Sequence, residues 1–432
     1  MVNTLRGGLG MHGDAGNRRG RRLFLRYLAA SPLLGEWARS AFAAPGGPPA
    51  TEPSSSPATL LEGLGEKPIA SPSEAVNVFD FEVVARRNLP PAHYGYLATG
   101  VDDDVTVRAN REGFRGVQLR ARHLVDVSRV DTTTELFGVR YDTPIVLAPA
   151  ASQKAFHPEG EVAVARAARA KGHLQVLASE ATASPEEVMA ARGGPVWFQL
   201  YPTGDWAVTE KLVRRAEGAG APVLVLTVDL PLGTNRDTAR RFARVDTRVC
   251  ASCHDSSFAG FVRRRPLWDG VDVSRVDNDV VPGMTWEFVR RLRGLTRMKL
   301  VLKGIVTRED AALALEQGVD GIVVSNHGGR SEESGRSTIE CLPEVVEAVG
   351  ARMPVLVDSG FRRGTDILKA LALGARAICI GRPYLWGLAA FGQPGVEAVL
   401  SLLRAELETA MRTVGTPSIG QITRASVIPS PR

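Results

Sequence analysis

The chain has 432 residues, of which 44% are hydrophobic and 23% are charged, a balance typical of globular proteins with a large buried core. Its formal net charge is +6, but the Lys and Arg residues are spread along the chain and form no basic block interleaved with aromatic residues. This distribution argues against a nucleic-acid-binding protein.

Residues 1–44 have the order of features that is typical of an export signal. The basic segment 18–26 precedes a modest Ala- and Leu-rich stretch that ends in the small-residue cleavage site Ala41-Phe42-Ala43. The pair Arg21-Arg22 resembles the twin-arginine type of signal, which usually carries proteins that bind their cofactor before export. We therefore expect an exported protein, in the periplasm or cell envelope of a bacterium. The alternative is a disordered basic tail, because Glu36 and Arg39 interrupt the apolar stretch.

Two segments come between this signal and the strands of the main domain. Residues 45–75 are rich in Pro, Ser, Gly and Ala, a composition that makes a flexible tether. From residue 77 to about residue 108 the pattern becomes helical, and we interpret this stretch as a short helical cap. The main domain is expected to span residues 76–425.

Eight short apolar runs follow the cap, and amphipathic stretches separate them. The runs are 144–148, 173–179, 196–201, 223–229, 300–303, 321–325, 355–358 and 377–381. Eight repeated β-α units over ~250 residues predict a closed (β/α)8 TIM barrel of the α/β class, since open sheets usually have fewer strands. The fourth and fifth runs are unusually far apart, from Asp229 to Leu300. We expect a long insertion there, after strand four, acting as a lid or docking element.

Nearly every run ends in polar or turn-forming residues or is followed directly by them. In chain order they are Pro149, Ala150 and Ala151; Ser179 and Glu180; Gln199 and Tyr201; Thr227 and Asp229; Lys303; Ser325, Asn326 and His327; Asp358, Ser359 and Gly360; and Gly381 and Arg382. Any one of them is explained equally well by a turn or a helix N-cap. Because the carboxyl ends of barrel strands meet at one mouth, their coincidence predicts a functional site there.

The loop after the sixth run combines an imidazole with a guanidinium. His327 and Arg330 lie three residues apart, with Gly328 and Gly329 between them. Histidine can accept a proton near neutral pH, and arginine can hold a carboxylate through two parallel hydrogen bonds. This pairing suits a substrate that carries both an acid and an alcohol, although a lone loop histidine is more often structural.

The loops after the seventh and eighth runs are typical of a phosphate site. They contain Asp358, Ser359, Gly360, Phe361 and Arg362 after strand seven, and Gly381 and Arg382 after strand eight. Barrels commonly bind phosphate at this place, where backbone N–H groups and arginines meet the anion. Lys303, at the end of strand five, can stabilise negative charge on a ring system beside it.

Together these stretches resemble the FMN-dependent α-hydroxy acid oxidases and dehydrogenases, which include glycolate oxidase, lactate oxidase and flavocytochrome lactate dehydrogenase. The resemblance covers about residues 77–423. It rests on Leu147-Ala148-Pro149, His157-Pro158-Glu159-Gly160, Phe198-Gln199-Leu200-Tyr201, Leu226-Thr227-Val228-Asp229, Lys303-Gly304, the segment 325–330 and Arg362-Arg363-Gly364-Thr365-Asp366.

The resemblance implies a role for each matching residue. His327 would be the base that takes a proton from the substrate, and Asp229 would pair with the imidazolium. Substrate binding would involve Tyr96, Tyr201, Arg236 and Arg330. FMN would be bound by Pro149, Ala150, Ala151, Gln199, Thr227, Lys303, Ser325, Asp358, Ser359, Gly360, Phe361, Arg362, Gly381 and Arg382. The implied reaction oxidises a small L-2-hydroxy acid and passes electrons to oxygen, a quinone or a cytochrome. A homo-oligomer is also expected.

Two positions depart from the family pattern. Many relatives have a flavin-contacting Ser and, two residues later, an active-site Trp, where this chain has Ala178 and Glu180. The usual Gln-Leu-Asp after the loop arginine is replaced by Ser331-Glu332-Glu333. A carboxylate at the mouth can repel a second acid group or bind a polar one, so a substrate other than glycolate is expected. The altered loop leaves a non-catalytic flavin-binding protein as an alternative.

The long insertion contains a short cysteine motif. Cys250 and Cys253 are followed by His254, with the spacing used for covalent c-type haem attachment. A haem there would make the protein a haem-linked electron carrier. A metal site, a redox disulfide and inert thiols remain as alternatives.

Overall fold

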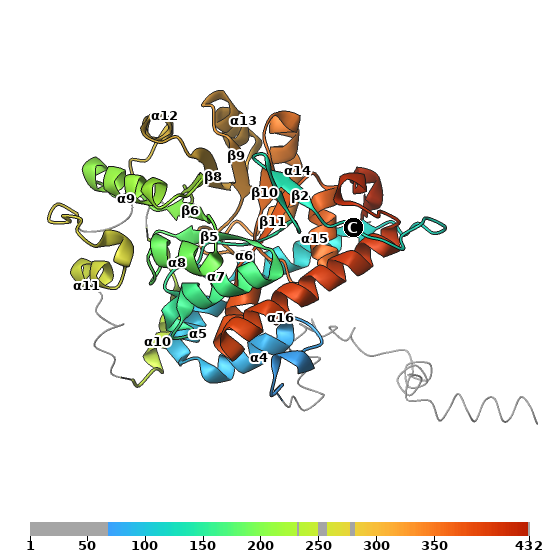
Figure 1. Ribbon diagram of the computed structural model, residues 1–432, viewed down its shortest axis with the longest axis horizontal. Helices are drawn as coiled ribbons and strands as arrows, with labels where there is room; N and C mark the ends of the chain where they lie inside the picture. The colour runs from blue at the N-terminus through green and yellow to red at the C-terminus, as the bar shows by residue number, and fades with distance from the viewer. Residues whose placement is uncertain (1–67, 231–232, 249–256, 277–280, 431–432) are drawn as a thin grey trace, which may run out of the picture. The chain divides into compact units, whose positions relative to one another are not determined.

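A computed structural model describes residues 68–230, 233–248, 257–276 and 281–430 (Figure 1). Eight parallel strands close into a barrel in the order β10-β11-β4-β5-β6-β7-β8-β9. They are β4 (Ile145–Leu147), β5 (Leu174–Ala178), β6 (Trp197–Leu200), β7 (Val223–Thr227), β8 (Lys299–Ile305), β9 (Gly321–Val324), β10 (Val355–Val357) and β11 (Ala377–Ile380). The predicted (β/α)8 barrel is therefore confirmed, and each strand lies within or overlaps its predicted run.

Helices follow the strands and surround the barrel. They are α7 (Gly160–Lys171), α8 (Pro185–Arg192), α9 (Trp206–Gly218), α12 (Trp286–Leu295), α13 (Arg308–Glu316), α14 (Thr338–Val349), α15 (Gly364–Ala372) and α16 (Arg382–Val414). Several of them begin with a side-chain cap. The Ser184 side chain accepts from the N–H of Glu187 in a capping box, and Asp205 accepts from the N–H groups of Ala207 and Val208.

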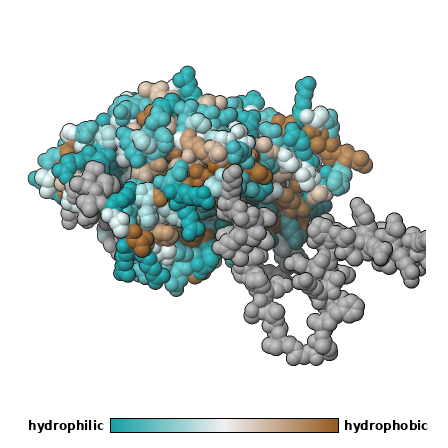
Figure 2. Space-filling model, turned by 90° about the horizontal axis from the view of Figure 1, so that it is seen from below, coloured by the Kyte–Doolittle hydropathy of each residue, from teal (hydrophilic) through white to brown (hydrophobic). Residues whose placement is uncertain are grey.

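Strand residues alternate between two apolar layers. On β7, Val223 and Val225 pack in the barrel interior, whereas Leu224 and Leu226 belong to the layer between strands and helices. Strands covered on both faces read as continuous apolar runs, which explains the sequence pattern. On the face shown in Figure 2, hydrophilic residues predominate and hydrophobic ones are scattered among them. Within the described ranges, no helix is both long and apolar enough to cross a membrane.

The predicted helical cap consists of α4 (Phe79–Asn88), α5 (Pro91–Ala98) and α6 (Val105–Glu112). Helix α4 packs against α16, and α5 packs against α10 (Asp237–Arg244), which lies in the insertion. This second contact requires a glycine, because a Cβ on Gly95 would lie 2.4 Å from Cβ of Phe242. The cap therefore connects the start of the domain to the insertion at the barrel mouth.

The expected insertion lies between β7 and α12. Besides α10 it contains α11 (Phe258–Arg263) and the 3-10 helix η4 (Pro266–Trp268). The rings of Phe258 and Phe261 both lie edge-on to Trp268, with centroids 5.9 and 6.0 Å away. Leu267 and Trp268 are buried in the main apolar core, and the two phenylalanines pack against that core, so this cluster anchors the insertion to the domain.

The remaining elements are two small sheets and short 3-10 helices. The sheets pair β1 (Val117–Leu119) with β12 (Val427–Pro429) and β2 (Thr134–Leu136) with β3 (Val139–Tyr141). The 3-10 helices are η1 (Pro72–Glu74), η2 (Gly113–Gly116), η3 (Gln153–Ala155), η5 (Gly350–Arg352), η6 (Ile419–Gln421) and η7 (Arg424–Ser426). Leu136 packs with the barrel interior, and the ring of Phe137 lies 5.5 Å from that of Trp197.

Candidate active site

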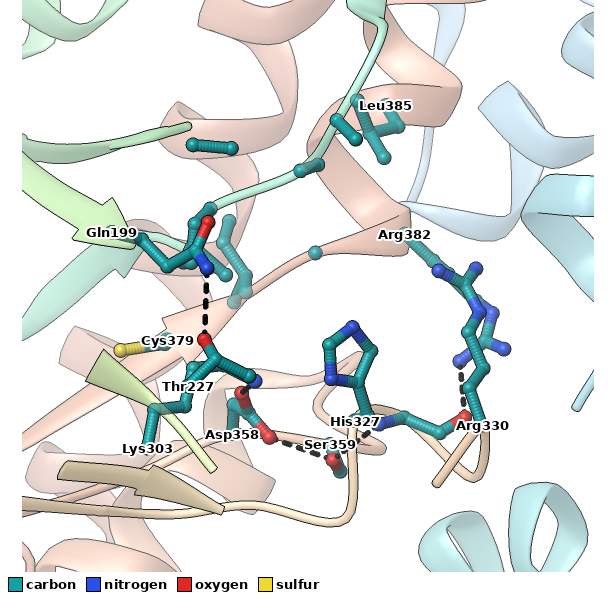
Figure 3. Close-up of a pocket in the computed structure, with 18 of the residues that line it drawn as sticks. Gln199, Thr227, Lys303, His327, Arg330, Asp358, Ser359, Cys379, Arg382 and Leu385 are labelled. Carbon is teal, nitrogen blue, oxygen red and sulfur yellow. Dashed lines mark hydrogen bonds and ion pairs between the residues drawn. The ribbon is translucent and has the colours of Figure 1, made fainter. Parts of the chain in front are cut away.

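A cavity of about 260 Å³ opens at the carboxyl ends of the barrel strands (Figure 3). All of the site residues predicted from the sequence line it except Asp229 and Ser325. Those that line it are Tyr96, Pro149, Ala150, Ala151, Gln199, Tyr201, Thr227, Arg236, Lys303, His327, Arg330, Asp358, Ser359, Gly360, Phe361, Arg362, Gly381 and Arg382. The other two are hydrogen-bonded to lining residues, Asp229 to His327 and Ser325 to Lys303. The structure thus brings the predicted catalytic, substrate-binding and FMN-binding residues together.

His327 lies in a left-handed backbone conformation directly after β9. Its φ is 58°, and Gly328 and Gly329 continue the left-handed path at 70° and 79°. This conformation is uncommon for a residue with a side chain and needs support from its surroundings. The N–H of His327 donates to Ser325 Oγ at 3.0 Å, and the N–H of Gly329 donates to Asn326 Oδ1 at 3.1 Å. The loop directs the imidazole into the cavity.

The imidazole of His327 has a polar partner on each nitrogen. Nδ1 lies 3.0 Å from Asp229 Oδ1, and Nε2 lies 3.1 Å from the Tyr201 hydroxyl oxygen. Because the carboxylate can only accept, Nδ1 carries the proton and Nε2 is left as the basic nitrogen. Asp229 fits behind the ring because the neighbouring residue is Gly304, where a Cβ would lie 2.6 Å from that of Asp229.

Electrostatics favour a neutral imidazole beside an ionised carboxylate. Burial lowers the pKa of His327, and Lys303 lowers it further against the opposing effect of Asp229. Burial acts to raise the pKa of Asp229, but His327 and Lys303 outweigh it and hold that pKa below its ordinary value. The pair is therefore arranged to accept one proton at Nε2, where the carboxylate stabilises the resulting imidazolium.

Two arginines flank the Tyr96 ring at the cap side of the cavity. The guanidinium carbons of Arg236 and Arg330 lie 5.8 and 5.2 Å from its centroid. Arg236 donates to the Gly100 carbonyl at 2.9 Å, and Arg330 donates to that of Leu97 at 2.9 Å. Burial and the neighbouring Arg330 lower the pKa of Arg236 to about 10. This arrangement provides two cations where a substrate carboxylate can bind.

Two further arginines lie at the ends of β10 and β11. Burial and the nearby Arg111 lower the pKa of Arg362 to about 9, and burial lowers that of Arg382 as well. The Arg362 guanidinium carbon lies 4.6 Å from the Trp386 ring centroid. Arg382 begins helix α16, whose N-terminal end is favourable for an anion. Its side chain turns toward the cap, donating to the Leu97 carbonyl at 2.9 Å.

Polar side chains on the barrel axis form the floor of the cavity. The buried Lys303 ammonium donates to Ser325 Oγ at 2.9 Å and lies 3.4 Å from Asp358 Oδ2. Burial acts to lower the pKa of Lys303, but Asp358 and Asp229 outweigh it, so the amine stays protonated. In Figure 3 the imidazole of His327 lies between this floor and the arginine side of the cavity.

Comparisons with known proteins identify the family. The sequence model of the FMN-dependent dehydrogenases matches residues 85–429, which is more than half of the chain. This protein belongs to that family. The chain is 40% identical to glycolate oxidase 1 of Zea mays over 368 residues, covering 82% of this chain and 96% of the maize protein. It is equally similar, at 40% over 367 residues, to glycolate oxidase of Spinacia oleracea, with the same coverage of both chains.

Solved structures give the same assignment. A mandelate oxidase bound to (S)-2-phenylpropionate is 39% identical with a TM-score of 0.72, covering 82% of this chain and 98% of that one. A glycine-to-alanine mutant of an active chimera of (S)-mandelate dehydrogenase is 34% identical with a TM-score of 0.74, covering 82% of this chain and 99% of that one. The protein is thus an oxidoreductase of the FMN-dependent hydroxy acid oxidase and dehydrogenase family.

The residues of the cavity fit FMN. Arg236, Arg330, Arg362 and Arg382 all line it, and no carboxylate among the described residues lies within ion-pair distance of any of them. Arg362 is buried and the other three are half-buried, and the carboxylate of Glu82 offsets the charges of Arg362 and Arg382 only in part, so anions from elsewhere are favoured in the cavity. A flavin phosphate and a substrate carboxylate together meet this requirement. The small segment Pro149, Ala150 and Ala151, in the loop after β4, also lines the cavity and leaves space for a flat ring.

Some residues of the site were not predicted from the sequence. Leu230 and Thr234, at the start of the insertion, also line the cavity. Behind the histidine loop, Asn110 and Asn326 exchange two amide hydrogen bonds of 2.9 Å. Asn110 lies on cap helix α6, 216 positions from its partner, and no local pattern indicates this pairing.

The two departures from the family pattern have structural partners. Glu333 Oε1 accepts from the N–H of Val105 at 2.7 Å, and Oε2 accepts from that of Thr106 at 3.1 Å, so the altered loop caps the first turn of α6. Glu180 lines the cavity and lies 3.7 Å from Arg265 of the insertion. Glu333 of the altered loop thus binds cap helix α6, and Glu180 at the mouth pairs with the insertion.

Several sequence predictions fall outside the described residues. These are the export signal and most of the linker, together with the motif of Cys250, Cys253 and His254.

Proposed function

We propose that this protein oxidises a small L-2-hydroxy acid to the 2-oxo acid. One observation carries the proposal: the basic Nε2 of His327 faces the same cavity as the two arginines of the cap side, Arg236 and Arg330. A base and a carboxylate clamp in one cavity match a substrate that has an acid next to an alcohol.

The geometry supports a separate role for each of the residues at the site. Arg236 and Arg330 hold the carboxylate, and the Tyr201 hydroxyl, 3.1 Å from His327 Nε2, contacts the substrate hydroxyl. His327 takes one proton from the substrate, and Asp229 stabilises the charge that develops on the ring. FMN, when bound, would accept the two electrons and the second proton that the substrate loses.

The electron acceptor and the location form a second part of the proposal. We infer that the chain is exported by its twin-arginine segment and passes electrons to oxygen or to a respiratory quinone or cytochrome. An envelope location favours the respiratory acceptor. We further propose that the protein is a homo-oligomer, which its mass in solution tests.

Anaerobic mixing tests the oxidation directly. Purified protein should be yellow, should release FMN on denaturation, and should lose its flavin absorbance with at least one of L-lactate, glycolate or L-mandelate. Release of FAD would contradict the cofactor assignment. A flavin that stays oxidised with every 2-hydroxy acid offered would show that the chain is a flavin-binding protein without this activity.

A further inference from the structure

A carboxylate and a guanidinium form an ion pair in the wall of the cavity. Glu180 follows β5 and lines the cavity, and its Oε2 lies 3.7 Å from Nη2 of Arg265. The side chains are 21% and 7% exposed, so Glu180 faces the open space and Arg265 lies behind it. The chemical group that this wall offers to a ligand is therefore a carboxylate whose charge is balanced from behind.

Arg265 is held in place from three sides. Nη1 donates to the Phe261 carbonyl at 2.9 Å, and the guanidinium carbon lies 3.6 Å from the centroid of the Phe261 ring. Nη2 donates to Ser152 Oγ at 3.1 Å, across to the loop after β4. An arginine fixed in this way has little freedom left to lose, so it orients the Glu180 carboxylate at small entropic cost.

Glu180 lines the part of the cavity that remains for the substrate side chain once the substrate carboxylate and hydroxyl have been placed. The substrate carboxylate is assigned to Arg236 and Arg330, and the substrate hydroxyl to Tyr201 and His327. Tyr201 lies at the end of the adjacent strand, and its N–H donates to Ser179 Oγ at 3.0 Å, next to Glu180. The third substituent on the reacting carbon therefore extends toward the wall that Glu180 and the insertion provide.

We propose that Glu180, oriented by Arg265, makes this enzyme selective for 2-hydroxy acids whose side chain carries a hydrogen-bond donor, a hydroxyl group above all. A carboxylate accepts several hydrogen bonds, so it can pair with Arg265 and bind a substrate hydroxyl together. Because Arg265 balances its charge, a neutral donor matches better than a cation. A second carboxylate on the substrate would place one acceptor against another, with no hydrogen for either to donate, so it would be bound poorly.

This inference rests on the proposed oxidation and is tested by a set of three substrates. L-Glycerate, L-lactate and L-malate differ at one side chain only, which ends in a hydroxyl, a methyl and a carboxylate. In anaerobic flavin reduction, the limiting rate divided by the substrate dissociation constant should be ~10-fold or more higher for glycerate than for lactate, because sites that hydrogen-bond a hydroxyl reject analogues that lack it. Malate should be the poorest of the three.

Variants at Glu180 identify the residue responsible. Glu180→Ala should reduce the glycerate-to-lactate ratio to about one, mainly by loss of glycerate turnover, and Glu180→Gln should improve malate relative to wild type. Glu186→Gln removes the same charge six positions later, on α8, where the side chain is 51% exposed and pairs with Arg215. This control should keep the wild-type ratio, and FMN content should be equal in all variants.

The outcomes separate this proposal from the proposed function. The role of Glu180 would be refuted if lactate reduced the flavin as efficiently as glycerate does. It would also be refuted if Glu180→Ala left the glycerate-to-lactate ratio unchanged. Either result would leave the proposed oxidation intact. Malate as the preferred substrate would also refute the role of Glu180. If none of the three acids, nor glycolate or mandelate, reduces the flavin, the proposed function fails and this inference fails with it.

Discussion

Asp229 Oδ1 lies 3.0 Å from His327 Nδ1, although 98 positions separate the two residues in the chain. Asp229 follows β7 and His327 follows β9, so closure of the barrel brings them together. The contact fixes the proton on Nδ1 and leaves Nε2 as the base, which is the arrangement that the proposed oxidation needs.

The pH dependence of kcat/KM should report on this imidazole. Only neutral His327 can accept a proton, so activity is present above its pKa and lost as the pH falls through it. Burial and Lys303 lower that pKa, so the acidic limb should lie below the ordinary imidazole value of about 6.5. The check is a series of kcat/KM measurements with one substrate at different pH values. An acidic limb centred above the ordinary imidazole pKa would contradict the neutral, buried imidazole.

Replacing the clamp residue should weaken substrate binding. Arg330→Met removes a charge-assisted partner of the carboxylate, worth ~1.5–3 kcal/mol, which is roughly 10- to 100-fold in substrate affinity. Arg330→Lys keeps the charge without the planar pair of donors and should recover part of the loss. Because Arg330 also donates to the Leu97 carbonyl, FMN content and thermal stability should be measured in parallel. Unchanged affinity in a folded Arg330→Met enzyme would remove Arg330 from the substrate site.

Adjacent arginines after β10 offer a matched test of the phosphate site. Arg362 is buried in the cavity wall, whereas the Arg363 side chain is 45% exposed and pairs with Glu406. Arg362→Met should raise the dissociation constant of FMN ~10-fold or more, by loss of a charge-assisted hydrogen bond to phosphate. Arg363→Met should leave it near the wild-type value. Equal effects of the two changes on FMN titration of the stripped protein would show that Arg362 has no special contact with the phosphate.

Most of the barrel and the site could be predicted because their signals are local. Each strand is a short apolar run that ends in polar residues, and the barrel rule then places those ends, His327 and Arg362 among them, at one mouth. No pairing between distant segments had to be known for this prediction. Residue roles then came from the family resemblance.

The rest of the site depends on long-range contacts that leave no local pattern. Arg265 meets Ser152 across 113 positions, and Asn110 meets Asn326 across 216. Neither arginine nor asparagine in a loop or helix signals such a partner by itself. The sequence also does not indicate the hairpin of β2 and β3, because strands of three residues are too short to show an alternating pattern.

Export through the twin-arginine segment can be tested by conservative changes. Replacing Arg21 and Arg22 by Lys keeps the positive charge but removes the paired arginines that such signals use. The protein should then accumulate in the cytoplasm, as seen by fractionation of expressing cells. Unchanged export of the double variant would show that these residues are not the signal.

The central claim is that His327 is the base of a flavin-linked oxidation, and anaerobic stopped-flow reduction of the His327→Gln enzyme tests it most directly. We expect normal FMN content, substrate binding close to wild type, and a rate of flavin reduction lower by ~10² or more, the range for loss of a positioned general base. Flavin reduction in His327→Gln at a rate within a few-fold of wild type would contradict this claim.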